Sequence, residues 1–144
     1  MEKSPSHPLM SKEELHAYFA SIAERYDNLG DRVTIVSLDA RRLEVQVDLE
    51  SIQLRPGGSV SGPAQFSLVD SVGWMMTVAH CGVGWDAFTA EVSMQFLRPL
   101  LPAKVTVEAE MLRRGRRLVM QMAIDPSPEG PATHAVVSFV ARRT

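Results

Sequence analysis

The sequence contains a single cysteine and carries almost no net charge. Its 144 residues include Cys81 as the one thiol, and the formal net charge is −2. One cysteine cannot form an internal disulfide, and sparing use of cysteine favours a reducing compartment, so we expect Cys81 to be a buried structural thiol. The near-neutral charge argues against nucleic acid or a membrane surface as the main partner.

Long apolar runs are also absent. No stretch approaches the ~18 consecutive apolar residues of a membrane-spanning helix. The first ten residues, MEKSPSHPLM, are polar, contain two prolines and lack the apolar core of a signal peptide. We therefore expect a flexible leader over 1–10, one domain over 11–144, and a cytoplasmic protein. The four histidines and the cysteine show no zinc-binding spacing, so neither a metal nor a cofactor is expected.

The periodicity of apolar residues predicts two helices and six strands. Ser11 begins the first helix, and Glu14 is placed to complete a capping box. The second helix, over 64–79, is apolar on nearly every side; Pro63 suits its first turn, and His80 is expected to cap its C-terminus. Alternating or β-branched runs predict strands at 33–38, 42–49, 87–97, 104–112, 117–124 and 133–141.

The order of these elements indicates the fold class. Short turns between consecutive strands are typical of an antiparallel sheet. A helix that is apolar all round needs cover on every side, which a curved sheet wrapped around it provides. The sequence therefore predicts an α+β fold, with a curved antiparallel sheet around one long central helix and an extra N-terminal helix.

One carboxylate, Asp70, interrupts the apolar central helix. An isolated ionised carboxylate in a dry core costs on the order of several kcal/mol, so Asp70 needs donors or a cavity. At helical spacing it shares a face with Ser67, Ser71 and Trp74. That stripe is either a wetted helix face or the wall of a cleft in which Asp70 acts as a base or nucleophile.

A glycine-rich loop over 55–63 precedes the same helix. Gly62 stands where the helix begins, and free N–H groups at a helix N-terminus can stabilise an oxyanion. Eight helical residues separate Gly62 from Asp70, about 12 Å at ~1.5 Å per residue, so one helix cannot bring both to the same carbon. Two antiparallel helices in a homodimer would place Gly62 of one chain opposite Asp70 of the other.

Several short motifs, in this order, resemble the hotdog-fold acyl-CoA thioesterases. The closest type is the phenylacetate-pathway (PaaI-like) group, related to 4-hydroxybenzoyl-CoA thioesterases, and the resemblance covers roughly residues 33–140. The matching motifs are Ser61-Gly62-Pro63, Leu68-Val69-Asp70, Thr89-Ala90-Glu91, Phe96-Leu97-Arg98-Pro99 and Arg114-Gly115-Arg116.

The resemblance implies a reaction and the residues that perform it. Asp70 matches the catalytic acid, which attacks as a nucleophile or activates water, and Gly62 matches the glycine whose N–H polarises the thioester carbonyl. Thr89 and Ser71 match hydroxyls beside the acid or the attacking water. The implied reaction is hydrolysis of an acyl- or aryl-CoA to the free acid and CoA. The implied assembly is a homodimer that associates further into a homotetramer.

Three positions depart from the family pattern. Arg55 stands where an Asn or Gln is common, Ser61 replaces a His, and Pro63 replaces a second glycine. Arg55 is a permanent cation that would pair with Asp70, contact the carbonyl, or bind a carboxylate on the substrate. Arg55 and Ser61, together with Trp74 one turn after the acid, are accordingly candidate substrate-binding residues.

An arginine-rich hairpin over 113–117 is either a solvated turn or a site for the CoA phosphates. Arg98, Arg114 and Arg116 are the candidate phosphate contacts. Two other functions share the fold: a non-catalytic acyl-CoA-binding module, which the altered turn at Arg55 motivates, and an enoyl-CoA hydratase. A hydratase would need a histidine near Asp70, and the sequence offers none there. A purely structural dimer would leave Asp70 unexplained.

Overall fold

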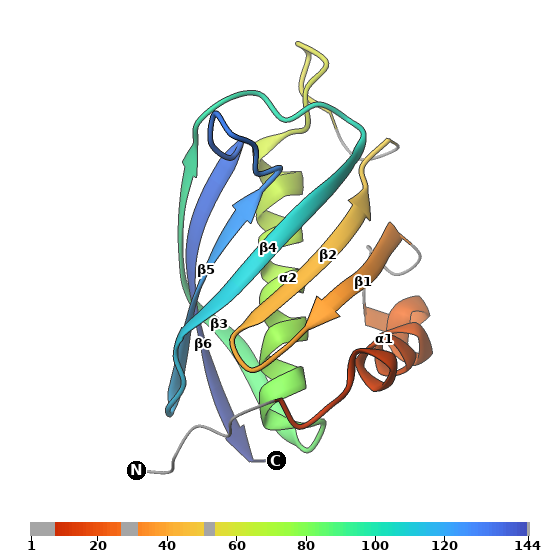
Figure 1. The fold of residues 1–144 in the computed structure, drawn as a ribbon, viewed down its shortest axis with the longest axis vertical. Coiled ribbons are helices and arrows are strands. Elements are labelled where there is room, and N and C mark those ends of the chain that lie inside the picture. The colour runs from red at the N-terminus through yellow and green to blue at the C-terminus, as the bar shows by residue number, and fades with distance from the viewer. Residues whose placement is uncertain (1–7, 27–31, 51–53, 144) are drawn as a thin grey trace.

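The structure, a computed structural model, describes residues 8–26, 32–50 and 54–143. One antiparallel sheet contains six strands in the order β1-β2-β4-β5-β6-β3 and curves around helix α2 (Figure 1). The predicted α+β fold is therefore confirmed. The elements are α1 (Lys12–Tyr26), β1 (Val33–Leu38), β2 (Arg42–Asp48), α2 (Gly62–Cys81), β3 (Trp85–Phe96), β4 (Lys104–Arg113), β5 (Arg117–Ile124) and β6 (Thr133–Arg143).

The predicted boundaries are right to within about two residues. The first helix begins with the expected capping box: the Glu14 N–H donates to the Ser11 hydroxyl at 3.1 Å, and the Ser11 N–H donates to the Glu14 carboxylate at 3.0 Å. Residues 1–7 of the expected leader lie outside the described residues. Its described end is tied to the domain, because the Leu9 N–H donates to the Ala79 carbonyl at 2.9 Å.

Helix α2 begins two residues earlier than predicted because Ser61 caps it. Ser61 has an extended backbone (φ −68°, ψ 157°), and its hydroxyl accepts the Ala64 N–H at 3.2 Å. At the other end the Gly82 N–H donates to the Val78 carbonyl at 2.8 Å. His80 is buried in the last turn, with Nδ1 2.9 Å from the Met76 carbonyl oxygen, and its expected role as a cap stays a prediction.

The core lies between α2 and the inner face of the sheet. Alternate residues of β2 point into it, and Leu43, Val45 and Val47 are fully buried. Each such side chain contributes about 1.5–3 kcal/mol by leaving water. No helix among the described residues is long and apolar enough to cross a membrane.

A glycine sets how closely α2 approaches the sheet. A Cβ on Gly73 would lie 2.5 Å from Cε1 of Phe139 on β6, so only a glycine lets the helix backbone meet this ring. Phe139 pairs in register with Thr89 on β3. The close approach at Gly73 therefore brings the middle of α2 within reach of Thr89.

Candidate active site

Asp70 lies in a small hollow where α2 meets β3 and β6, which we call the Asp70 hollow. The carboxylate is partly exposed, so it is not an isolated charge in a dry core. The expected stripe is confirmed in part: Ser71 and Trp74 share the hollow, whereas Ser67 lines a neighbouring groove. The lining residues are Asp70, Ser71, Trp74, Ala87, Phe88, Thr89 and Phe139.

Thr89 holds the Asp70 carboxylate. Its hydroxyl donates a hydrogen bond to Asp70 Oδ1. The register between β3 and β6 shifts immediately after this residue, since Thr89 pairs with Phe139 and Glu91 pairs with Ser138. Bulges of this kind re-aim side chains locally, and this one lies directly beside the residue whose hydroxyl reaches α2. One carboxylate oxygen is therefore fixed, while Oδ2 receives no hydrogen bond from the described residues.

Trp74 is supported by the N-terminal helix. Its ring makes an edge-to-face contact with Phe19 of α1, with centroids 5.0 Å apart and planes at 80°. Phe19 packs in the same way on Tyr18, at 5.4 Å. Such pairs stabilise by about 0.5–1.5 kcal/mol beyond the buried area. Helix α1 thereby fixes one wall of the Asp70 hollow.

Gly62 presents a backbone donor at the start of α2. The N–H groups of Ala64 and Gln65 donate to Ser61, whereas the Gly62 N–H donates to no group in the part of the chain that the structure describes. A Cβ on Gly62 would lie 3.8 Å from Cζ of Phe96, an ordinary contact. The Gly62 N–H is thus available to an acceptor from outside the chain.

An apolar groove, which we call the Gly62 groove, adjoins this donor. Phe66 and Phe96 expose 47% and 55% of their surface there, although both are large apolar side chains. No charged residue lines the groove. Gly62 and Asp70 therefore lie in separate depressions on one chain, as their spacing along the helix predicts. The groove is lined by Gly62, Pro63, Phe66, Ser67, Val92, Met94 and Phe96.

Arg55 is engaged within its own turn. Its Nη1 donates to the Ser59 hydroxyl at 3.1 Å, and its guanidinium folds over Gly57. The turn closes through Gly58, which has φ +88° and donates its N–H to the Arg55 carbonyl at 2.9 Å. The pairing of Arg55 with Asp70, one of the alternatives that the sequence left open, is absent within the described part of the chain. Ser61 is buried as the cap of α2.

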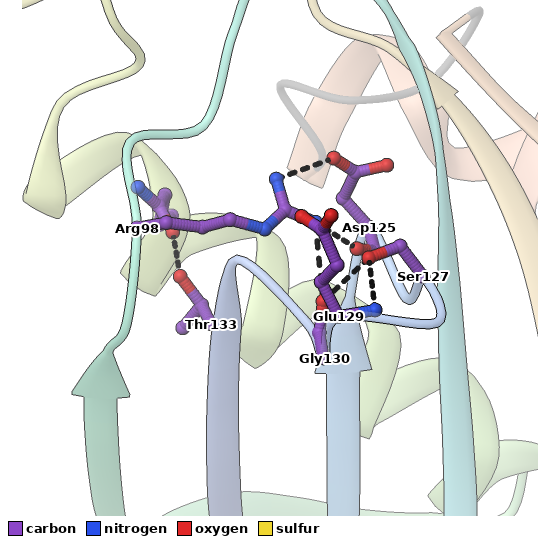
Figure 2. A network of polar contacts seen from close by, with 7 residues as sticks. Arg98, Asp125, Ser127, Glu129, Gly130 and Thr133 are labelled. Carbon is purple, nitrogen blue, oxygen red and sulfur yellow. Dashed lines mark hydrogen bonds and ion pairs between the residues drawn. The ribbon is translucent and has the colours of Figure 1, made fainter.

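Two of the three arginines expected at the CoA phosphates make contacts within the fold. Arg98 donates to the Asp125 carboxylate at 3.1 Å and to the carbonyls of Asp125 and Gly130 at 2.7 and 3.3 Å, which ties down the β5–β6 turn (Figure 2). Arg114 donates to the His80 carbonyl at the end of α2. Arg116 is exposed, with no ion pair among the described residues.

Cys81 is half-buried beside Arg114. Burial raises the pKa of the Cys81 thiol, and the nearby guanidinium only partly opposes this. A thiol with a raised pKa is a poor nucleophile at neutral pH, so the surroundings of Cys81 do not suit a reactive cysteine. The expected structural thiol therefore fits its surroundings, although its burial is only partial.

A buried polar pair beside the Gly62 groove was not predicted from the sequence. Gln65 is 4% exposed and Thr133 is fully buried, and the two side chains are hydrogen-bonded. A signal for Gln65 was present, because it falls three residues before the buried Leu68 and four before Val69 on the same helix stripe. Thr133 carries no comparable signal, since its partner is 68 residues away.

The comparisons with known proteins agree with this geometry. A sequence model described as Thioesterase superfamily matches residues 57–120. A curated protein named "Putative esterase SSO2140", from Saccharolobus solfataricus, is 25% identical over 88 residues, which is 61% of this chain. The match spans 62% of that protein, so less than two thirds of the relative is represented.

Solved structures share the fold over most of the chain. A "putative thioesterase" from Silicibacter sp. TM1040 has a TM-score of 0.81 and 24% identity, covering 95% of each chain. The protein smu.793 from Streptococcus mutans UA159, solved with acetyl CoA bound, has a TM-score of 0.68 and 17% identity, covering 78% of this chain and 90% of its own. Residues 57–120, which run from the glycine turn into β5, therefore match the Thioesterase superfamily model, and the chain as a whole has the hotdog fold.

Proposed function

We propose that this chain is a thioester hydrolase that cleaves acyl-CoA to a free acid and CoA. The observation that carries the proposal is the Asp70 carboxylate, which Thr89 holds by one oxygen in a partly exposed hollow. The family match at 57–120 and the acetyl CoA bound to the similar Streptococcus mutans protein support a CoA thioester as substrate.

The chemistry follows from the free oxygen of Asp70. In one route Oδ2 takes a proton from a water molecule while the water oxygen attacks the thioester carbon. In the other, Oδ2 attacks the carbon itself and forms an anhydride, which water then hydrolyses. In both routes negative charge develops on the carbonyl oxygen, where the Gly62 N–H would donate, and the C–S bond breaks to release CoA as a thiolate that takes up a proton.

The site needs two chains, and the sheet offers the means to join them. Strand β3 is an edge strand of 12 residues and exposes Trp85, Phe88 and Phe96. Long apolar edges pair readily with another strand. We infer a homodimer across β3, in which Gly62 of one chain faces Asp70 of its partner. Further assembly into a homotetramer is a prediction that the native mass tests.

The linings of the two depressions indicate the substrate. The Gly62 groove carries no charge and begins beside the proposed oxyanion donor, so we propose an uncharged, apolar acyl or aryl group as its occupant. Ser71 and Trp74 line the hollow around the acid and would contact the thioester. Among the three proposed phosphate contacts, Arg116 is the exposed one and is the first to test.

A hydrolysis panel tests the proposal. Wild-type protein, Asp70→Asn and the control Asp48→Asn, on β2 away from the site, are each assayed for thiol release from acetyl-, hexanoyl-, phenylacetyl- and succinyl-CoA. We expect wild type and the control to hydrolyse the uncharged substrates, and Asp70→Asn to lose about 10²–10⁴-fold in kcat while still binding CoA. Binding without thiol release by wild type would instead make the chain an acyl-CoA-binding module.

A further inference from the structure

Gln65 uses both ends of its side-chain amide in the interior of the protein. It lies in the first turn of α2 and is 4% exposed. Its Nε2 donates to the Val60 carbonyl at 3.3 Å, and its Oε1 accepts from the Thr133 hydroxyl. A buried amide is costly unless both ends are bonded, and an apolar side chain could fill the same volume. The fold alone therefore does not require a glutamine here.

Both partners of Gln65 are connected to the segment that carries the Gly62 donor. Val60 is two residues before Gly62, and its own N–H donates to the Leu100 carbonyl at 2.8 Å. Thr133 begins β6 and pairs in register with Phe96 on β3, whose ring lies against Gly62. The amide thus connects the glycine turn to the strand that carries the other side of the groove.

The strand end that Gln65 binds is itself held firmly. The Ala132 N–H donates to the Ile124 carbonyl at 2.9 Å, and the Leu97 N–H donates to the Ala132 carbonyl at 2.8 Å. Arg98 spans the turn that precedes Thr133 and binds two of its carbonyls (Figure 2). Thr133 is therefore a fixed point from which Gln65 can orient the more exposed glycine turn.

We propose that Gln65 is a positioning residue that sets the direction of the Gly62 N–H. The inference rests on the proposed function, in which this N–H stabilises the oxyanion. By bonding the Val60 carbonyl, Gln65 restricts rotation of the peptide that leads into Ser61 and Gly62. A donor displaced by about 1 Å can lower the rate by about 10²-fold, because oxyanion stabilisation depends on geometry.

The test compares matched substitutions of buried and outer-face residues. Gln65→Met and Thr133→Val break the connection, and Thr133→Ser keeps the hydroxyl. Thr77→Val is the control for losing a buried threonine on the same helix, since the Thr77 hydroxyl donates only to the Gly73 carbonyl, at 2.8 Å. Gln121→Met is the control on the outer face of the sheet, where Gln121 binds Glu110.

The expected result is a separation of kcat from KM. Gln65→Met and Thr133→Val should lower kcat by about 10–100-fold with KM within about threefold, because the donor acts mainly in the transition state. Thr133→Ser should restore kcat, and neither control should lower it. If Gln65→Met lowers kcat no more than Thr77→Val at equal loss of thermal stability, Gln65 has only a structural role and the proposal is overturned.

A second readout does not depend on catalysis. Hydrogen exchange measured by mass spectrometry over residues 57–64 should be faster in Gln65→Met and Thr133→Val, and unchanged in Thr77→Val. If wild type hydrolyses no acyl-CoA yet exchange follows this pattern, the proposed function fails while the positioning of the turn stands. If exchange over 57–64 is unchanged in Gln65→Met, the positioning fails whatever the activity.

Discussion

At the scale of single residues, the site depends on how Thr89 holds Asp70. The hydroxyl binds Oδ1 of an acid that lines the hollow, so rotation of the carboxylate is restricted. Thr89 was expected at the site from a family resemblance, and the fold places it on the acid itself. The physical reason is the register of β3 against β6, which sequence periodicity cannot give to single-residue accuracy.

Replacing Thr89 tests this arrangement. Thr89→Val should lower kcat by about 10–100-fold, because a freely rotating carboxylate attacks or accepts a proton less efficiently. Thr89→Ser should retain most of the activity, and the melting temperature of both should stay close to that of wild type, since the site is partly exposed. Steady-state kinetics and thermal denaturation measure these quantities. If Thr89→Val keeps the full wild-type kcat, the Thr89 hydroxyl does not contribute to catalysis.

At the scale of secondary structure, the elements could be predicted from local sequence signals, whereas contacts between distant elements could not. The sequence predicted α2, the capping box of α1 and every strand, because their signals are local: alternation, caps and turn residues. The sequence could not predict the contacts of Arg98 and Arg114, which were expected to bind the CoA phosphates. Their partners on the β5–β6 turn and at the end of α2 are 27 and 34 residues away, so only the fold brings them together.

Gly73 is expected to be the most sensitive position of α2. In Gly73→Ala the new Cβ would lie 2.5 Å from the Phe139 ring, and relieving that overlap should destabilise the protein by about 1–3 kcal/mol. The displaced helix should also separate Asp70 from Thr89 and lower kcat. Urea unfolding and kinetics check both effects, and Phe139→Leu in the same chain should restore part of the stability. Unchanged stability in Gly73→Ala would contradict the packing described.

The turn between β1 and β2 gives a dependence on pH. Asp39 Oδ1 accepts the N–H groups of Arg41 and Arg42, each at 2.9 Å, and these bonds lower the pKa of the Asp39 carboxyl below its ordinary value. A lowered folded-state pKa stabilises the protein above the ordinary value of 3.8, and this stabilisation is lost as the pH falls through the folded-state pKa.

Asp39→Ala should therefore melt below wild type at pH 7, and the difference between the two melting temperatures should shrink as the pH falls below 3.8. Thermal denaturation across this range measures the difference. The matched control is Asp48→Ala, whose carboxylate accepts a single N–H, that of Glu50 at 3.0 Å. A difference that grows on acidification would have the wrong sign for this account.

At the scale of the whole molecule, the proposed dimer places the two halves of the proposed site on different chains. Asp70 and Gly62 lie eight residues apart on one helix, and the edge strand β3 beside it exposes Trp85, Phe88 and Phe96. A pairing across β3 would cover that edge and complete two equivalent sites, since a two-fold dimer repeats every contact.

Two substitutions of Gly62 test its role as a backbone donor, and both are expected to preserve the fold. Gly62→Pro removes the N–H donor, and the position accepts proline because Ser61 is already extended and proline is tolerated in the first turn of a helix. Gly62→Ala keeps the N–H and meets Phe96 at an ordinary distance, so it serves as the control and should stay active. Alone, Gly62→Pro should lose about 10²–10³-fold in kcat.

Mixing Asp70→Asn with Gly62→Pro chains tests the central claim most directly. After unfolding and refolding together in equal amounts, about half of the dimers are mixed and each holds one intact site of two, so about a quarter of wild-type activity should return. Differently tagged chains purified through both tags confirm that mixed dimers form. If such dimers stay as inactive as the separate variants, Asp70 and Gly62 do not act across chains and the account is wrong.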